Sequence, residues 1–371
     1  MTSSPAVTVL TQLPPVFWLL VAVCFGGALV LWWRIGGRRR VMRRRGLQRQ
    51  IALCGQAESA AEQATLDGLQ QAPRRARQAL VRSTGHRAAL YRVPWLLFLG
   101  DSAADVPRLL DAASASAGGS DTFQPFWQWH ALPAMVAIGI DPQILQPATS
   151  ARVRRLWCQA LLALALERPR LPLNGIVVCV GASSLLQGAT DTSSATCLRQ
   201  LIDEAAEHLH LRLPIYLVIT GLEKLSGYDT LRSSLSRDVQ AQVIGYRWSG
   251  AAGAGAAASA RADDRAATAF VSIMARLDAL RMALLLQNST PSARLAIHAF
   301  VEQVRALEPG LRQTANVLFG RFKEGRRPQR WRGLYLTGST PSGADASGAA
   351  FASDLFERFL PADQPLARSD A

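Results

Sequence analysis

The sequence predicts an α/β protein built on a mostly parallel sheet, with a helical extension and one membrane-spanning helix before it. Three observations predict this class. Short apolar runs alternate with helix-like stretches, a later segment carries apolar residues at helical spacing, and a long uncharged run stands near the N-terminus. The 371 residues suffice for a core with an appendage, and 49% hydrophobic against 18% charged residues excludes a disordered chain.

Five apolar runs predict buried strands, because the strands of a parallel sheet are covered on both faces and need no polar alternation. They occupy residues 94–100, 134–140, 175–180, 214–220 and 333–337. The stretches between them predict helices at residues 151–167, 194–211 and 228–243. Residues 90–248 therefore form the predicted α/β domain.

The flanking segments have different compositions. Residues 34–89 predict a basic, mostly helical linker that Pro73 divides in two. The Gly/Ala-rich residues 249–262 predict a flexible loop. Apolar residues at helical spacing predict a helical subdomain over residues 263–330, and residues 331–371 supply the last strand and a short C-terminal helix.

Residues 13–33 carry no charge, and at about 1.5 Å per residue this run is about 31 Å long, enough to cross a bilayer core. No acidic residue occurs before Glu58, whereas eight arginines directly follow the run: Arg34, Arg38, Arg39, Arg40, Arg43, Arg44, Arg45 and Arg49. Positive charge after the run predicts a single span, with the N-terminus outside and the rest cytoplasmic. A buried core helix is the alternative for the run.

The net charge of +14 arises from 41 Lys+Arg against 27 Asp+Glu. Because the arginine cluster follows the predicted span, we expect it to set topology and contact anionic lipid rather than nucleic acid. Only Lys224 and Lys323 are lysines, and neither follows a glycine, so the chain has no intact phosphate-binding P-loop. Five cysteines without a CxxC pair, and no clustered histidines, predict no metal site and no catalytic residue.

The carboxyl ends of the predicted strands are where an open α/β sheet binds ligands. Gly100, Asp101 and Ser102 follow the first strand, and Asp141 follows the second. A phosphate loop needs several glycines, whose N–H groups approach the ligand, and then a lysine. One glycine with neighbouring carboxylates would instead repel a triphosphate, so we expect no bound nucleotide cofactor.

Several stretches have a counterpart, in the same order, in one known family. They are residues 94–99, 170–178 with 182–186, 213–220 with 225–228, and 332–343. The stretch at 170–178, for example, is similar to the family's Arg-Pro-Leu-Asn-Gly strand. Together, over about residues 90–360, they resemble the TssM (IcmF-like) family of inner-membrane proteins of type VI secretion.

The resemblance implies a GTPase-like domain of the P-loop type with a helical extension, on the cytoplasmic face of the bacterial inner membrane. In the family this domain belongs to the complex with TssL and TssJ and docks onto the baseplate. This chain departs from the family at all three nucleotide-contacting motifs, including the TKxD motif, where residues 220–223 read Thr-Gly-Leu-Glu. The departures imply a vestigial nucleotide site at Gly100, Asp101, Ser102, Asp141, Thr220 and Glu223.

Two main hypotheses follow for the function. The first is a short, catalytically inactive TssM-like member, covering the anchor and the cytoplasmic domain, that acts as a structural or adaptor subunit. Its expected partners are the lipid bilayer, TssL-like, TssM-like and baseplate subunits, and further copies in an oligomer. The second is an NTPase switch with a non-standard phosphate loop, in which an arginine such as Arg108 replaces the lysine. Nucleic-acid binding is a third class, with less support.

Overall fold

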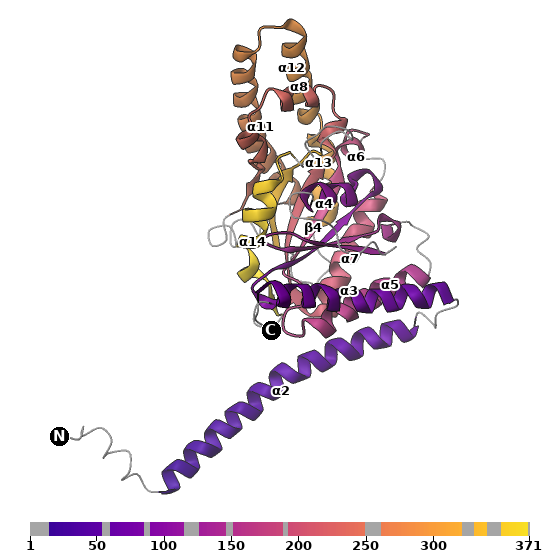
Figure 1. The fold of residues 1–371 in the computed structure, drawn as a ribbon, viewed down its shortest axis with the longest axis vertical. Coiled ribbons are helices and arrows are strands. Elements are labelled where there is room, and N and C mark those ends of the chain that lie inside the picture. Colours follow the sequence, from indigo (N-terminus) through magenta and orange to yellow (C-terminus); the bar gives the residue numbers. More distant parts are fainter. Residues whose placement is uncertain are drawn as a thin grey trace, which may run out of the picture.

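A seven-stranded sheet forms the centre of the molecule (Figure 1). The computed structural model describes residues 15–53, 60–84, 90–114, 126–145, 151–187, 192–248, 261–320, 330–339 and 350–369. The strand order is β2-β3-β1-β4-β6-β8-β7. The strands are β1 Trp95–Gly100, β2 Trp127–Ala131, β3 Val136–Ile140, β4 Gly175–Gly181, β6 Pro214–Thr220, β7 Ile244–Arg247 and β8 Arg330–Leu336. The five central strands are parallel, and the edge strands β2 and β7 pair antiparallel with their neighbours.

Both faces of the sheet are covered, which explains the uninterrupted apolar runs. In β1, Leu97 faces the larger core cluster, which includes residues of α5 (Ala151–Glu167) and α7 (Ser193–Leu209). The next residue, Phe98, faces the opposite cluster, which includes residues of α4 (Val106–Ser114). There the ring of Phe98 stacks on Phe356, from a π-helical turn at Leu355–Phe359. The mostly parallel α/β sheet predicted from the sequence is confirmed.

All five predicted strands are present in the seven-stranded sheet, but its two edge strands, β2 and β7, were not predicted. In β2, the polar Gln128 and His130 alternate with Trp127 and Trp129, so this strand lacks a continuous apolar run. The helix predicted at residues 228–243 is wrong in its extent, because two short helices, α8 (Tyr228–Ser233) and α9 (Arg237–Ala241), occupy it. The chain then continues as the other edge strand, β7.

Three helices form the extension at one end of the molecule: α11 (Ala262–Gln287), α12 (Pro291–Arg305) and α13 (Glu308–Phe319). Gly227, at φ +83°, lies against α12 so closely that a Cβ there would sit 2.0 Å from the carbonyl oxygen of Ala296. The Gln303 side chain accepts a hydrogen bond from the Ser226 N–H at 2.7 Å. These contacts fix α12 against the loop before α8. The flexible loop predicted at 249–262 lies largely outside the described residues.

Two helices precede the sheet domain, α2 (Pro15–Leu53) and α3 (Ala60–Thr84). The predicted division at Pro73 is wrong, because α3 continues through this proline. Pro73 is buried beside Ala72 on the face of α3 that packs toward the domain, and packing there offsets the hydrogen bond that a proline cannot donate. The N-terminal part of α2 extends away from the domain (Figure 1).

Arg43 docks α2 onto the domain. Its guanidinium is 4% exposed and donates to the carbonyl oxygens of Pro169 at 3.3 Å and His210 at 3.5 Å, just beyond the C-terminal ends of α5 and α7. A cation there is stabilised by the negative ends of the helix dipoles. Arg43 therefore has a structural contact in addition to the role in membrane topology that the sequence predicts for it. Arg44 and Arg45 are exposed, and the side chains of Arg34, Arg38, Arg39 and Arg40 lie outside the described part.

Along the described residues, no helix combines the length and hydropathy that a membrane-spanning segment needs. The span predicted at residues 13–33 is therefore not confirmed.

A buried carboxylate ties the C-terminal segment to the sheet. Asp363 accepts hydrogen bonds from the Tyr216 hydroxyl at 2.9 Å and from Arg332 at 3.1 and 3.3 Å, and it pairs with Arg247. Burial raises the pKa of Asp363, but the hydrogen bonds from Arg332 and Arg247 outweigh burial and hold that pKa below its usual range. Beyond it, β9 (Arg368–Ser369) pairs with β5 (Leu211–Arg212), so the C-terminus lies at the same end of the molecule as α3 (Figure 1).

A buried ion pair between α3 and α5 yields a stability prediction. Arg155 and Glu62 lie 2.5 Å apart, and their side chains are 4% and 3% exposed. We expect Glu62→Ala to lower the free energy of unfolding by about 3–5 kcal/mol, because it leaves the arginine charged and buried. The exposed Glu302, which pairs with Arg281 at 2.8 Å, is the matched control, and Glu302→Ala should cost under about 1 kcal/mol. Urea unfolding of the full chain in detergent measures both, and equal costs would contradict the prediction.

Candidate functional site

The strand order identifies where a ligand would bind. Taken in chain order, the parallel strands are β1, β3, β4, β6 and β8, and across the sheet they lie as β3-β1-β4-β6-β8. The order therefore reverses between β1 and β4, and doubly wound sheets bind ligands outside the carboxyl ends of the strands at such a point. Asp101 directly follows β1, and α6 (Ala182–Leu186) directly follows β4.

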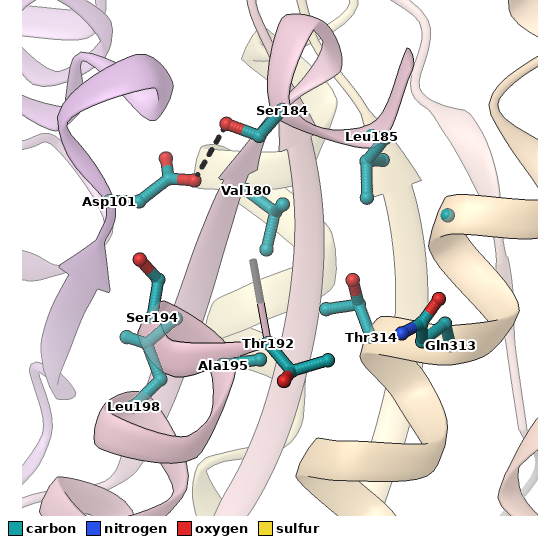
Figure 2. Close-up of a pocket in the computed structure, with 11 residues that line it drawn as sticks. Asp101, Val180, Ser184, Leu185, Thr192, Ser194, Ala195, Leu198, Gln313 and Thr314 are labelled. Carbon is teal, nitrogen blue, oxygen red and sulfur yellow. Dashed lines mark hydrogen bonds between the residues drawn. The ribbon is translucent and has the colours of Figure 1, made fainter. Parts of the chain in front are cut away.

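The carboxylate of Asp101 is bound by the protein itself. One oxygen accepts the N–H of Ala104 at 2.8 Å and that of Gly181 at 3.4 Å. The other accepts the hydroxyl of Ser184 at 3.0 Å (Figure 2). Backbone N–H groups and a hydroxyl are the donors that would surround a phosphate at such a loop. The Asp101 carboxylate therefore accepts the hydrogen bonds that these donors could offer to a phosphate.

Two carbonyl oxygens of the loop after β1 also accept hydrogen bonds from side chains of the protein. The Thr220 hydroxyl donates to the carbonyl of Ala104 at 2.8 Å, and the Lys224 ammonium donates to that of Ala103 at 3.1 Å. Gly181 packs so closely that a Cβ there would lie 2.7 Å from the carbonyl of Ala103. The loop after β1 is thus held against the carboxyl ends of β4 and β6.

Glu223 closes the loop after β8. Its two carboxylate oxygens accept the Ser339 N–H at 2.9 Å and the Ser339 hydroxyl at 2.6 Å, and Ser339 is 6% exposed. The preceding Gly338 lies over Tyr228, since a Cβ there would be 2.4 Å from the tyrosine oxygen. Burial first, and then the charge of Glu223, raise the pKa of Tyr228, which therefore stays neutral. The Glu223 carboxylate, at the last position of the TKxD-like stretch, therefore makes an internal contact.

A small cavity remains between the strand ends, α7 and α13 (Figure 2). Its volume is about 50 Å³, whereas sites for drug-sized ligands occupy roughly 300–1,000 Å³. Polar and apolar groups share the lining, and its polar side chains are those of Asp101, Ser184, Thr192, Ser194, Gln313 and Thr314. This space suits water and is far too small for a nucleotide.

The predicted site residues do not form one cluster. Asp141 caps its own turn, Pro142–Leu145, by accepting the Gln143 N–H at 2.8 Å, and it does not line the cavity. Gly100 packs against Val106, and Ser102 is exposed. Only Asp101 and Thr220 meet at the first loop, while Glu223 joins the loop after β8. Within the described residues, no three metal-ligating side chains gather.

Sequence reasoning missed five residues that contribute to this closure: Ser184, Lys224, Ser339 and, from α13, Gln313 and Thr314. Ser184 and Ser339 lie inside the stretches that carry the family resemblance. Lys224 stands one residue after the TKxD-like motif, where its reach across to Ala103 has no signature in the sequence. The α13 residues come from the helical extension, far along the chain.

The Arg-Pro-Leu-Asn-Gly-like stretch lies at the opposite, amino end of the strands. The Asn174 side-chain oxygen accepts the Trp95 N–H and the Arg168 guanidinium, both at 2.9 Å. Arg168 is fully buried and stacks over the rings of Trp95 and Tyr91. Burial lowers the pKa of Arg168 to about 10, so it stays charged at neutral pH. This motif joins β1 to β4 and contributes nothing to the candidate site.

These features define a doubly wound α/β domain whose ligand-binding edge is occupied by its own side chains. The model of the IcmF-related N-terminal domain family matches residues 150–371, more than half of the chain, and the chain belongs to that family. It is also 27% identical over 272 residues to the type VI secretion system component TssM1 of Pseudomonas aeruginosa strain PAO1.

That match covers 70% of this chain and 24% of TssM1, so the chain spans about a quarter of the length of this curated relative. No solved structure matches the chain. The family predicted from the ordered sequence stretches is confirmed.

We expect Glu223→Ala to lower the free energy of unfolding by about 1–3 kcal/mol, because it leaves the buried Ser339 N–H without its acceptor. Glu223→Gln should cost less, since an amide oxygen still accepts one hydrogen bond. Glu357→Ala, at an exposed position, is the control and should stay within about 0.5 kcal/mol of wild type. Thermal unfolding followed by circular dichroism measures all three, and an unchanged Glu223→Ala protein would argue against this contact.

Proposed function

We propose that the protein is a membrane-attached, non-catalytic structural subunit of a type VI secretion apparatus. Its α/β domain would be a P-loop-type domain, related to GTPases, that has lost its nucleotide site. The observation that carries the proposal is the internal hydrogen bonding of Asp101 and Glu223, at the two loops where a nucleotide would bind. Membership of the IcmF-related family and the likeness to TssM1 support the assignment to type VI secretion.

Electrostatics support the loss of nucleotide binding. A triphosphate entering at the first loop would have to displace Asp101 from its donors while facing that carboxylate's charge. Lys224 is a nearby cation, and its ammonium already donates a hydrogen bond to the carbonyl of Ala103. Arg108, the lysine substitute that the alternative NTPase hypothesis requires, does not line the cavity.

The N-terminal part of α2 supports membrane attachment. Large apolar side chains there are 41–70% exposed, namely Val16, Phe17, Trp18, Leu19, Leu20, Val21, Val23, Phe25 and Val30. In water this exposure is costly, and lipid would remove it. The exposed Arg44 and Arg45 follow along the same helix, where anionic head groups would attract them. The α2 end of the molecule would then face the membrane.

The proposed partners are TssL-like, TssM-like and baseplate subunits, contacted from the cytoplasmic side. This assignment comes from the family resemblance and from the name of the relative. The end that carries α11 and α12 points away from α2 and would be presented to soluble subunits (Figure 1).

A titration tests the non-catalytic part of the proposal. Calorimetry of the full chain in detergent should register no heat with Mg-GTP or Mg-ATP at up to about 1 mM, because the donors for phosphate are occupied. A known GTPase in the same detergent is the positive control. A micromolar Kd that Arg108→Ala abolishes would favour the NTPase hypothesis instead.

Affinity purification tests the structural role. The tagged full chain, extracted from membranes of its native host, should retain type VI secretion subunits and should resist removal from membranes by alkaline carbonate. Deletion of residues 15–33 should release the protein from membranes, because it removes the exposed apolar side chains. Purification without any secretion subunit, or carbonate release of the full chain, would contradict the proposal.

A further inference from the structure

The outer face of α11 carries an apolar stripe that nothing in the described structure covers. Val271, Met282 and Leu286 are 64%, 57% and 83% exposed, and between them lie the exposed Ala275 and Ala279. The spacings of 4, 4, 3 and 4 residues place all five on one side of the helix. At 1.5 Å per residue the stripe is about 22 Å long.

The inner face of the same helix is already buried in the core. Phe270, Ile273 and Leu277 are buried in the main core, against α12 and α13. With a second stripe outside, α11 is apolar on both sides, and a helix of that kind is normally buried on both sides. Packing among the described residues therefore does not explain the outer stripe.

The stripe has the dimensions of a helix-pairing surface. Apolar residues that repeat every three or four positions form the seam along which a second helix packs. The central Ala275 and Ala279 have small side chains, which let another helix approach closely, and the larger Met282 and Leu286 lie toward one end. The helix is held rigidly, since Arg276 donates to the Gly245 carbonyl of β7 at 3.2 Å.

The charged side chains beside the stripe indicate what charge a partner helix would carry. Asp278 beside the stripe is already paired with Arg281 and Arg305, both at 3.0 Å. Arg276 is exposed, and its guanidinium donates to the Gly245 carbonyl rather than to a carboxylate. The unneutralised charge beside the stripe is therefore positive, and a matching helix carries carboxylates next to its apolar residues.

A second copy of α11 offers less charge complementarity. Its Asp278 is already paired with Arg281 and Arg305 of its own chain, so it presents no unpaired carboxylate beside the stripe to Arg276 of the first copy. In a parallel pair, Arg276 would also face its own equivalent, and like charges there are destabilising, so the stripe favours a different chain.

We propose that the outer face of α11 docks an amphipathic, acid-flanked helix of another subunit. This inference rests on the proposed function, since that subunit belongs to the same secretion assembly. A single helix pair is smaller than a standard protein interface, so the contact is weak by itself. Holding both partners in one complex raises their effective concentration and makes such a contact sufficient.

Site-specific photo-cross-linking in the native host tests the proposal with the full chain. A benzoylphenylalanine at position 282 should yield an adduct with a type VI secretion subunit, within a peptide that contains carboxylates and apolar residues at helical spacing. The yield should fall as salt rises from about 50 to 500 mM, because screening weakens the charge contacts. The same cross-linker at Leu186, exposed but outside α11, should give no adduct with that subunit.

Two variants and a matched control complete the test. Leu286→Glu and Ala275→Glu should each lower the adduct yield about tenfold, because they place a carboxylate on the stripe opposite an acidic helix. Leu295→Glu, on α12 at 68% exposure, introduces the same charge off the stripe and should leave the yield unchanged. Circular dichroism confirms that all three variants fold.

The outcomes separate this inference from the proposed function. If secretion subunits co-purify with the wild type but position 282 reacts only with lipid, with a second copy or with nothing, the inference is wrong and the proposed function stands. Equal loss in the Leu295→Glu control would also overturn it. An adduct with an unrelated protein, and no secretion subunit in the purification, would overturn both.

Discussion

The internal binding of the Asp101 carboxylate is the contact on which the arrangement of the strand ends depends. Polar backbone groups at this edge of a parallel sheet must be satisfied by a ligand, by water or by the protein. In this protein one side chain takes the N–H groups of the loops after β1 and β4 together with the Ser184 hydroxyl. The two loops are thereby joined without any ligand, and α7 and α13 close around the small space that remains.

This closure changes what the edge can do. A loop that must open to bind a ligand is drawn from the less stable parts of a fold, whereas an edge tied by internal charge-assisted hydrogen bonds stays in one state. Thr220, Lys224 and Glu223 extend the same ties to the loops after β6 and β8. In the described structure the edge is closed by the protein's own side chains, in keeping with the non-catalytic role proposed above.

The sequence predicted the strands that are buried on both faces, because continuous apolar residues are a local signal. It missed β2 and β7, since edge strands carry polar alternation or are very short. Pro73 was misjudged for a different reason: the cost of a proline in a helix is local, while the packing that offsets it is tertiary. The pair Glu223 and Ser339 stands 116 residues apart, and no spacing rule connects such positions.

Arg43 connects the N-terminal helix α2 to the α/β domain. Its position among the arginines after an apolar run predicts a role at the membrane, yet its guanidinium lies buried against the C-terminal ends of α5 and α7. The arginine cluster therefore divides between lipid-facing candidates and a structural dock. Through that dock, α2 is attached to helices that pack on the sheet, and the sheet in turn holds α11 through Arg276 and β7. Among the described segments, α2 and the α11 face are thus connected through packed helices and the sheet.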